Sequence, residues 1–333
     1  MKKFTLRLSL FALPFVLALY PMDYFISNTL RKSNSFANWE YPVWNDIFNG
    51  NIKSEIIING SSRAWKGVDA VMLGDAFNKK AYNIGLDGHD FYLENLRYNL
   101  LLEHNQKPEL IIMILDNHTL AEATRIYTPE QLLPYMLWNS TMREPITKLK
   151  AYNYYDGIIP MIRYYGKRSS LKEFARLQIR KHPKNDINKI RGYHGFEMDW
   201  DPTEFQNLKN DLKKKHKKTF DTKLYKPTVQ LFDKFLSESK SNNIEVVLVY
   251  APEFIEGQKV MGNRKEIIDV YANFGRKYNF PFYDYSRDSI SYDQSNFYNV
   301  LHLNKNGAEI FTKDLIKRLK HEKNLQSNFM YSK

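Results

Sequence analysis

The sequence contains no cysteine, so it can form neither a disulfide bond nor a cysteine-linked lipid anchor. Its 8 histidines are scattered without the spacing of metal ligands, and no glycine-rich phosphate loop is present. We therefore expect no metal and no other cofactor. A chain without disulfide bonds fits an exported bacterial protein and an intracellular protein equally well.

Acidic residues are outnumbered by basic ones, 37 against 49, which gives a formal net charge of +12. The densest basic run extends from Lys213 to Lys218, and a solvated helix face is its favoured interpretation. The alternative is contact with an anionic partner, such as lipid headgroups or an acidic cell-surface polymer. Nucleic acid is disfavoured as a partner, because no base-stacking module is visible.

The N-terminal segment has the pattern of a membrane address. It begins with the basic residues Lys2, Lys3 and Arg7. The uncharged stretch 8–22 follows, and it reaches spanning length if it continues past Asp23. No Ala-x-Ala-like cleavage site is present, so we expect residues 1–28 to be an uncleaved signal anchor, with the bulk of the chain outside the cytoplasm. The alternatives are a cleaved signal peptide and a buried amphipathic helix.

Apolar runs rich in β-branched and aromatic residues predict five strands in the remaining chain. They occupy residues 55–59, 81–84, 110–115, 245–250 and 280–283. Helical periodicity fills the gaps, and this alternation is typical of an α/β fold with a parallel sheet. The stretch of about 120–226 is too long for a connection and predicts a large, mostly helical insertion. Residues 29–53 are mostly polar with a few aromatic anchors, and they predict a linker.

Chemically useful residues follow the predicted strands, at the sheet edge where ligands of open α/β sheets bind. Ser62 lies on a turn after Gly60, and a serine hydroxyl becomes a nucleophile when a neighbouring base takes its proton. His302, just before a late helix, is the best-placed base. The backbone N–H groups of Ser62 and Gly88 and the side-chain amide of Asn117 could stabilise the negative charge on an attacked carbonyl oxygen.

The sequence segments around Ser62, Gly88, Asn117 and His302, in this order along the chain, resemble the four conserved blocks of the SGNH/GDSL hydrolase family. The resemblance covers roughly residues 51–320. The resemblance implies a three-layer, flavodoxin-like fold in which residues 54–322 form the catalytic domain and 323–333 a polar tail. It also implies that Ser62 is the nucleophile, that Gly88 and Asn117 are oxyanion-hole donors beside the Ser62 N–H, and that His302 is the base. The motifs are weak individually, and the inference depends on their order and strand-end context.

One position departs from the family pattern. The family has Asp-x-x-His in its last block, and here Asn299 stands three residues before His302. An amide oxygen can fix the tautomer of a histidine but carries no charge to stabilise the imidazolium. Asp284 and Asp293 are therefore alternative candidates for the acid that orients His302.

Each site residue also has a purely structural interpretation. The turn at Gly60 could carry a serine N-cap, Gly88 could serve only a left-handed backbone, and Asn117 could be a turn residue. His302 could cap or pack near the helix that follows it. The four blocks in order favour the catalytic interpretation.

We expect a membrane-anchored enzyme that acts on an ester through a serine acyl-enzyme. The family resemblance suggests O-acetyl groups of cell-surface polysaccharides or wall polymers as substrates, by hydrolysis or by transfer. A non-catalytic accessory subunit of a polysaccharide modification or export complex is one alternative, and a lipid esterase is another.

Overall fold

The chain folds into two compact units, which the computed structural model describes over residues 2–137, 139–179, 190–322 and 325. The N-terminal unit comprises Met1–Asp46 and Thr124–Asn185. The sheet unit comprises Ile47–Ala123 and Asp186–Lys333. The polypeptide therefore leaves the sheet unit once, contributes to the N-terminal unit, and returns.

Five parallel strands form the centre of the sheet unit, in the order β2-β1-β3-β4-β5. The strands are β1 Ile56–Gly60, β2 Ala81–Asn83, β3 Leu110–Leu115, β4 Glu245–Tyr250 and β5 Phe282–Asp284. This is the strand order of flavodoxin-like, doubly wound sheets. The predicted α/β class with five parallel strands is confirmed.

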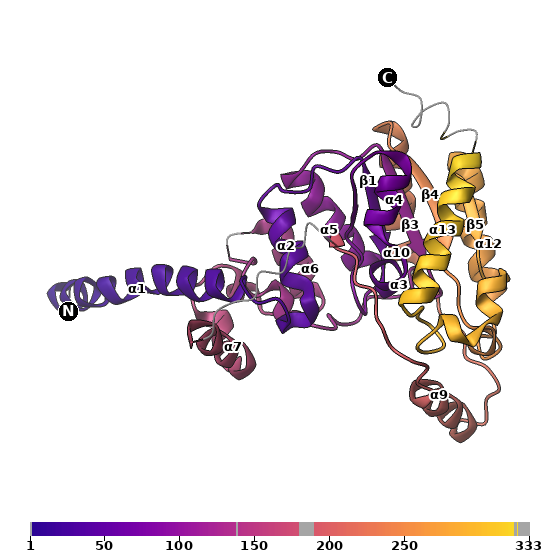
Figure 1. Cartoon of the computed structure of the whole chain (residues 1–333). Helices are drawn as coiled ribbons and strands as arrows, with labels where there is room; N and C mark the ends of the chain where they lie inside the picture. The colour runs from indigo at the N-terminus through magenta and orange to yellow at the C-terminus, as the bar shows by residue number, and fades with distance from the viewer. Residues whose placement is uncertain (1, 138, 180–189, 323–324, 326–333) are drawn as a thin grey trace. The chain divides into compact units, whose positions relative to one another are not determined.

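Helices cover both faces of this sheet (Figure 1). On one face lie α3 Ser62–Gly67, α4 Ala70–Phe77 and α13 Lys305–His321. On the other lie α5 Phe91–His104, α10 Lys226–Ser241 and α12 Arg264–Tyr278. Successive side chains of a strand point to opposite faces, so the continuous apolar runs of the central strands suit burial on both sides.

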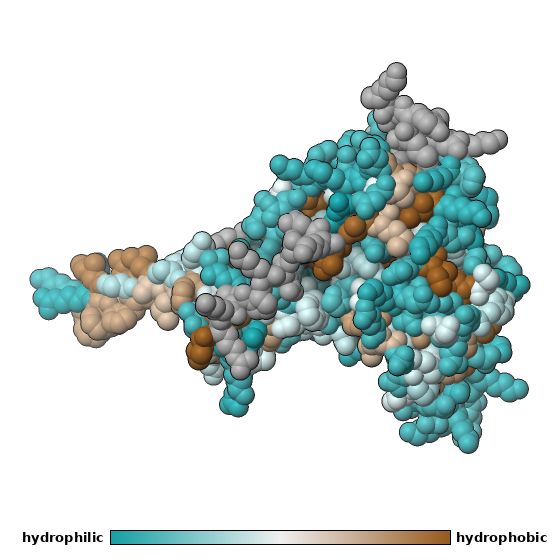
Figure 2. Space-filling model, viewed as in Figure 1, coloured by the Kyte–Doolittle hydropathy of each residue, from teal (hydrophilic) through white to brown (hydrophobic). Residues whose placement is uncertain are grey.

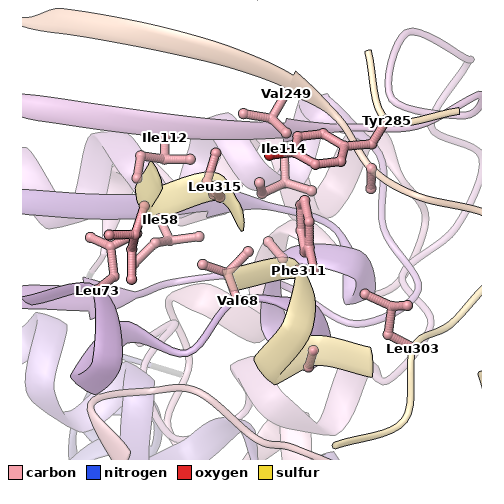
Figure 3. Packing of buried hydrophobic residues seen from close by; sticks show 14 of the residues in the cluster. Ile58, Val68, Leu73, Ile112, Ile114, Val249, Tyr285, Leu303, Phe311 and Leu315 are labelled. Atoms are coloured by element: carbon pink, nitrogen blue, oxygen red, sulfur yellow. The ribbon is translucent and has the colours of Figure 1, made fainter. Parts of the chain in front are cut away.

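The core on the α13 side is made by alternate strand residues and one helix face. Figure 3 shows Ile58, Ile112 and Ile114 of the sheet packed with Phe311 and Leu315 of α13. All of these side chains are buried. On the opposite face, the rings of Phe91 and Phe232 meet edge to face at 4.8 Å. Both layers hold the carboxyl ends of the strands in fixed positions.

The sheet unit contains further helical segments. They are α9 Thr203–Lys214, α11 Ile255–Gln258 and the 3₁₀ turns η5 Ser289–Tyr292 and η6 Gln294–Asn296. The basic run from Lys213 to Lys218 begins in the last turn of α9 and is exposed throughout.

The N-terminal unit is helical in the residues that the structure describes. Its α-helices are α1 Lys2–Leu30, α2 Glu40–Phe48, which ends in the sheet unit, α6 Ser140–Lys148 and α7 Arg168–Ile179. Its 3₁₀ turns are η1 Phe36–Trp39, η2 Pro129–Leu132, η3 Tyr154–Gly157 and η4 Ile162–Tyr164.

Helix α1 has 29 residues and an 18-residue window of mean hydropathy 1.6, which is long and apolar enough to cross a membrane. Figure 2 shows this apolar stretch as brown side chains beyond a hydrophilic tip. Its large apolar residues from Phe4 to Leu17 are exposed. A membrane anchor and a signal sequence both have these properties.

The C-terminal third of α1 belongs to the core of the N-terminal unit. Asp23 is buried, and its carboxylate receives two hydrogen bonds from the Arg163 guanidinium, at 2.6 and 2.7 Å. The backbone N–H of Met161 donates to the same carboxylate at 2.7 Å. Ser27 binds the hydroxyl of Tyr164 at 2.7 Å. These contacts tie α1 to η4.

The structure differs from the predicted linker over 29–53. This segment contains the end of α1, η1 and α2, and its Tyr41 and Trp44 side chains are buried. The Trp44 indole N–H donates to the Gln131 side chain at 3.0 Å, so the segment is part of a packed unit. The predicted insertion is also divided, because Thr124–Asn185 joins the N-terminal unit while the rest belongs to the sheet unit. The predicted tail 323–333 lies outside the described residues apart from Leu325.

Candidate active site

Ser62 is presented by a tight turn between β1 and α3. Gly60 has φ +142°, and a Cβ there would lie 2.4 Å from the carbonyl oxygen of Ile114 in the neighbouring strand. Glycine is therefore required at this position. Ser61 is the N-cap of α3, with its side-chain oxygen 3.3 Å from the Arg63 N–H. Because Ser61 takes the capping role, the Ser62 hydroxyl is left for another partner.

That partner is His302, whose Nε2 atom lies 2.8 Å from the Ser62 Oγ. The two residues are 240 positions apart in the sequence and meet because β1 and the segment before α13 end at the same edge of the sheet. The ring of Tyr298 stacks on the His302 ring at 5.4 Å with an interplanar angle of 6°. The His302 ring is thus held by stacking on its face and by hydrogen bonding at its edge.

Asn299 occupies the position behind the histidine. Its Oδ1 atom lies 3.0 Å from His302 Nδ1 and also accepts the backbone N–H groups of Leu301 and His302, at 3.0 and 2.8 Å. An amide oxygen there requires a proton on Nδ1, which leaves the Nε2 lone pair facing Ser62. This is the tautomer that can accept the serine proton.

The pKa of His302 is well below its ordinary value. Partial burial of the ring disfavours the charged form, and the positive charges of Lys66 and Arg63 lower the pKa further. His302 is therefore neutral at pH 7, as a general base has to be.

The two alternative acids do not take the orienting position. Asp284 ends β5 and accepts the Ser286 N–H at 2.8 Å. Asp293 caps η6 and accepts the N–H and the hydroxyl of Ser295, at 2.9 and 2.7 Å. The nitrogen of His302 that faces away from Ser62 binds Asn299 instead.

The predicted oxyanion donors sit in three loops at the same sheet edge. Gly88 has φ +72° in the turn between β2 and α5. Outside the helices and strands, the backbone–backbone hydrogen bonds of the described residues include none donated by Ser62 or Gly88. Asn117 is buried, and its Nδ2 donates to Glu253 at 2.8 Å while its Oδ1 accepts the Tyr250 hydroxyl at 2.5 Å. One amide hydrogen of Asn117 therefore has a structural partner.

A buried network lies under the site, and its Glu253 was not identified from the sequence. Arg63 pairs with Glu253 at 2.5 Å and lies 4.0 Å from the carboxylate of Asp116. Asp116 also accepts the Ser61 hydroxyl at 2.6 Å. Burial raises the pKa of Asp116, but the Arg63 guanidinium, His118 and the hydrogen bond from Ser61 together outweigh it and hold the pKa below its ordinary value. The network fixes the Ser61 turn against the loop that carries Asn117.

Lys66 is a second residue that sequence analysis did not single out. It lies one helical turn after Ser62 and pairs with Asp87 at 3.2 Å. Its ammonium group is 5.0 Å from the centre of the Phe196 ring and 5.8 Å from that of Tyr298. The four-residue spacing places Lys66 and Ser62 on the same face of a helix, and this is the sequence feature that could have identified Lys66. The ion pair links α3 to the loop that precedes Gly88.

Comparisons with known proteins give limited information. No protein-family model matches the sequence, and no curated protein matches it. Among solved structures, the chain is similar to a proposed acylhydrolase from Bacteroides fragilis NCTC 9343. The two share 13% sequence identity with a TM-score of 0.36, over 86% of this chain and 99% of the other. A likeness at this level carries no argument about activity, which has to rest on the site itself.

Proposed function

We propose that this protein is a serine-dependent esterase or acyltransferase of the SGNH type. The observation that carries the proposal is the contact of 2.8 Å between Ser62 Oγ and His302 Nε2, with the other ring nitrogen of the histidine bound to Asn299. A hydroxyl, a neutral imidazole and a group that fixes the imidazole are the parts of an activated nucleophile. They lie at the carboxyl edge of the sheet, where this fold class binds its ligands.

In the proposed reaction, Ser62 Oγ forms a bond to the carbonyl carbon of an ester while its proton moves to His302 Nε2. The carbonyl oxygen becomes an oxyanion, and the N–H groups of Ser62 and Gly88 and the remaining amide hydrogen of Asn117 are its proposed donors. When the tetrahedral intermediate collapses, the bond to the leaving alcohol breaks and the imidazolium returns the proton to that alcohol. An acyl-enzyme on Ser62 remains.

The second half of the reaction releases the acyl group. His302 takes a proton from an incoming hydroxyl, which attacks the acyl-enzyme and regenerates the Ser62 hydroxyl. If water attacks, the protein is an esterase. If a sugar hydroxyl attacks, the protein is an acyltransferase, and this outcome requires that water be excluded from the site.

The proposed substrates are O-acetyl groups on a cell-surface polysaccharide or wall polymer. This choice is supported by the resemblance to SGNH hydrolases and by α1, which we propose to be a membrane anchor with the sheet unit outside the cytoplasm. The exposed basic run from Lys213 to Lys218 is proposed to contact an anionic polymer or lipid headgroups.

The proposal is tested by labelling the full-length protein in detergent with a fluorophosphonate probe and locating the label by mass spectrometry. We expect the label on Ser62 and its complete loss in the Ser62→Ala variant. Ser241, at the end of α10, is the matched control, and Ser241→Ala should label like the wild type. Labelling elsewhere, or retained turnover of a small acetyl ester in Ser62→Ala, would exclude this function.

The non-catalytic accessory role is the second candidate, and Asn299 is the observation that favours it. An uncharged amide gives less support to an imidazolium than a carboxylate does. A folded protein whose Ser62 neither labels nor turns over an acetyl ester would support the accessory role.

A further inference from the structure

The amide of Asn299 is bound on both sides. Its oxygen accepts three N–H groups, one of them from the His302 ring. Its nitrogen donates to the Oε2 atom of Glu204 at 2.8 Å. Glu204 lies in the first turn of α9, 95 positions before Asn299.

We propose that Glu204 is a positioning residue of the active site, which sets the orientation of the Asn299 amide and supplies the negative charge that the amide lacks. This inference rests on the proposed function and extends it to a line of four side chains, Ser62, His302, Asn299 and Glu204. Glu204 touches neither the substrate nor the reacting atoms and acts through Asn299.

The orientation argument follows from the groups around the amide. An ionised carboxylate can only accept hydrogen bonds, so the NH₂ group of Asn299 has to face Glu204. Turning the amide over would place its oxygen against the carboxylate and its NH₂ group against the N–H groups of Leu301 and His302. Both sides of the amide would then lose their partners. Glu204 therefore helps to hold the oxygen toward His302, which selects the tautomer that Ser62 needs.

The charge argument concerns the imidazolium that forms when Ser62 attacks. Two positive groups of α3, Lys66 and Arg63, lower the pKa of His302. A carboxylate behind the amide opposes them. A hydrogen bond to a charged acceptor polarises the donor, so Asn299 presents a more negative oxygen to the ring. Glu204 is exposed, so solvent screens its charge and the effect should be modest.

The pairing also explains why a carboxylate at position 299 would not simply improve the site. An aspartate there would place one oxygen near the Oε2 of Glu204, where Asn299 Nδ2 now lies at 2.8 Å. Two carboxylates at that separation cannot both ionise, and they share one proton. An asparagine therefore fits a site that already has a glutamate behind it.

A double-mutant cycle on the full-length protein tests this inference. We expect Glu204→Gln to lower kcat/KM for a small acetyl ester by about 3- to 10-fold, mainly through kcat, because one screened charge and one amide orientation are lost. Asn299→Asp alone should gain little. In the Asn299→Asp background, Glu204→Gln should instead raise kcat/KM by about 3-fold or more, because the introduced aspartate no longer shares a proton with a second carboxylate and is ionised behind the His302 ring.

The change of sign is the decisive result, because a residue that only stabilises α9 would lower activity in both backgrounds. Asp211→Asn is the control, since it removes the same charge from an exposed position on the same helix. An equal effect of Glu204→Gln in both backgrounds, or an effect no larger than that of Asp211→Asn, would overturn the inference.

A second measurement does not depend on turnover. The pKa of His302, followed by NMR in the Ser62→Ala protein, should fall in Glu204→Gln and stay unchanged in Asp211→Asn. An unchanged pKa of His302 in Glu204→Gln would overturn the charge argument even if the protein proved to be inactive. Absence of labelling at Ser62 in the wild type would instead refute the proposed function. Failure of this inference and failure of the proposed function are therefore distinguishable.

Discussion

Ser61 and Ser62 are neighbours with opposite roles, and alanine substitutions should separate them. Ser61 caps α3 and donates a hydrogen bond of 2.6 Å to the buried carboxylate of Asp116. Loss of a serine N-cap costs about 0.5–2 kcal/mol, and a buried acceptor left without its donor adds about 1 kcal/mol or more. We therefore expect Ser61→Ala to lower the free energy of unfolding by about 2 kcal/mol.

Ser62→Ala should have a much smaller effect on stability. The Ser62 hydroxyl binds the partly buried His302 ring, and a hydrogen bond of this kind contributes about 1 kcal/mol or less. At about 2–4 °C for each kcal/mol, Ser61→Ala should lower the Tm by about 4–8 °C and Ser62→Ala by less than about 4 °C. The same samples should show the reverse order in activity, with probe labelling retained in Ser61→Ala below its Tm and absent in Ser62→Ala.

Circular dichroism on heating and fluorophosphonate labelling at 20 °C below each Tm together check this prediction. The reasoning would be refuted by equal losses of Tm in the two variants. It would also be refuted if Ser61→Ala, while still folded, failed to label.

Two further predictions concern pH and the N-terminal unit. The pKa of His302 is well below its ordinary value, so the neutral, active form should persist as the pH falls through about 6.5. We therefore expect kcat/KM to decline only at a lower pH. A half-maximal point at or above pH 6.5 in a pH–rate profile would contradict this. Asp23→Ala should destabilise the protein by about 3–5 kcal/mol, because it leaves the Arg163 guanidinium buried without its anion. Combining Asp23→Ala with Arg163→Met should recover part of the lost stability. Thermal unfolding in detergent micelles measures both variants, and equal stability of the single and double variants would argue against the ion-pair explanation.

The strands β1, β3 and β4 could be predicted because their apolar runs are continuous and buried on both faces. The predicted strand 280–283 begins two residues later in the structure, as β5 at Phe282. The cause is local, since Pro281 has no N–H to donate. The segment 29–53 was misread as a linker because its overall composition is polar. Its buried residues Tyr41, Trp44 and Ile47 nevertheless recur every three positions, which indicates one face of a helix.

Within the candidate site, the residues that follow strands could be found, and their supporting partners could not. Ser62 and His302 stand in turns with a recognisable sequence pattern, and the structure brings them together. Glu204 and Glu253 carry no local signal. They meet Asn299 and Asn117 across 95 and 136 positions, so only the fold creates these contacts.

The way in which α1 continues into the N-terminal unit bears on how a soluble form of this protein should be prepared. A version that starts at Ser33, after the whole helix, would lose the buried residues Ile26 and Leu30 along with the partner of Arg163. Starting at Tyr20 would remove most of the exposed apolar residues and keep those that the unit needs for packing. For protein production, the useful boundary therefore lies inside the helix and not at its end.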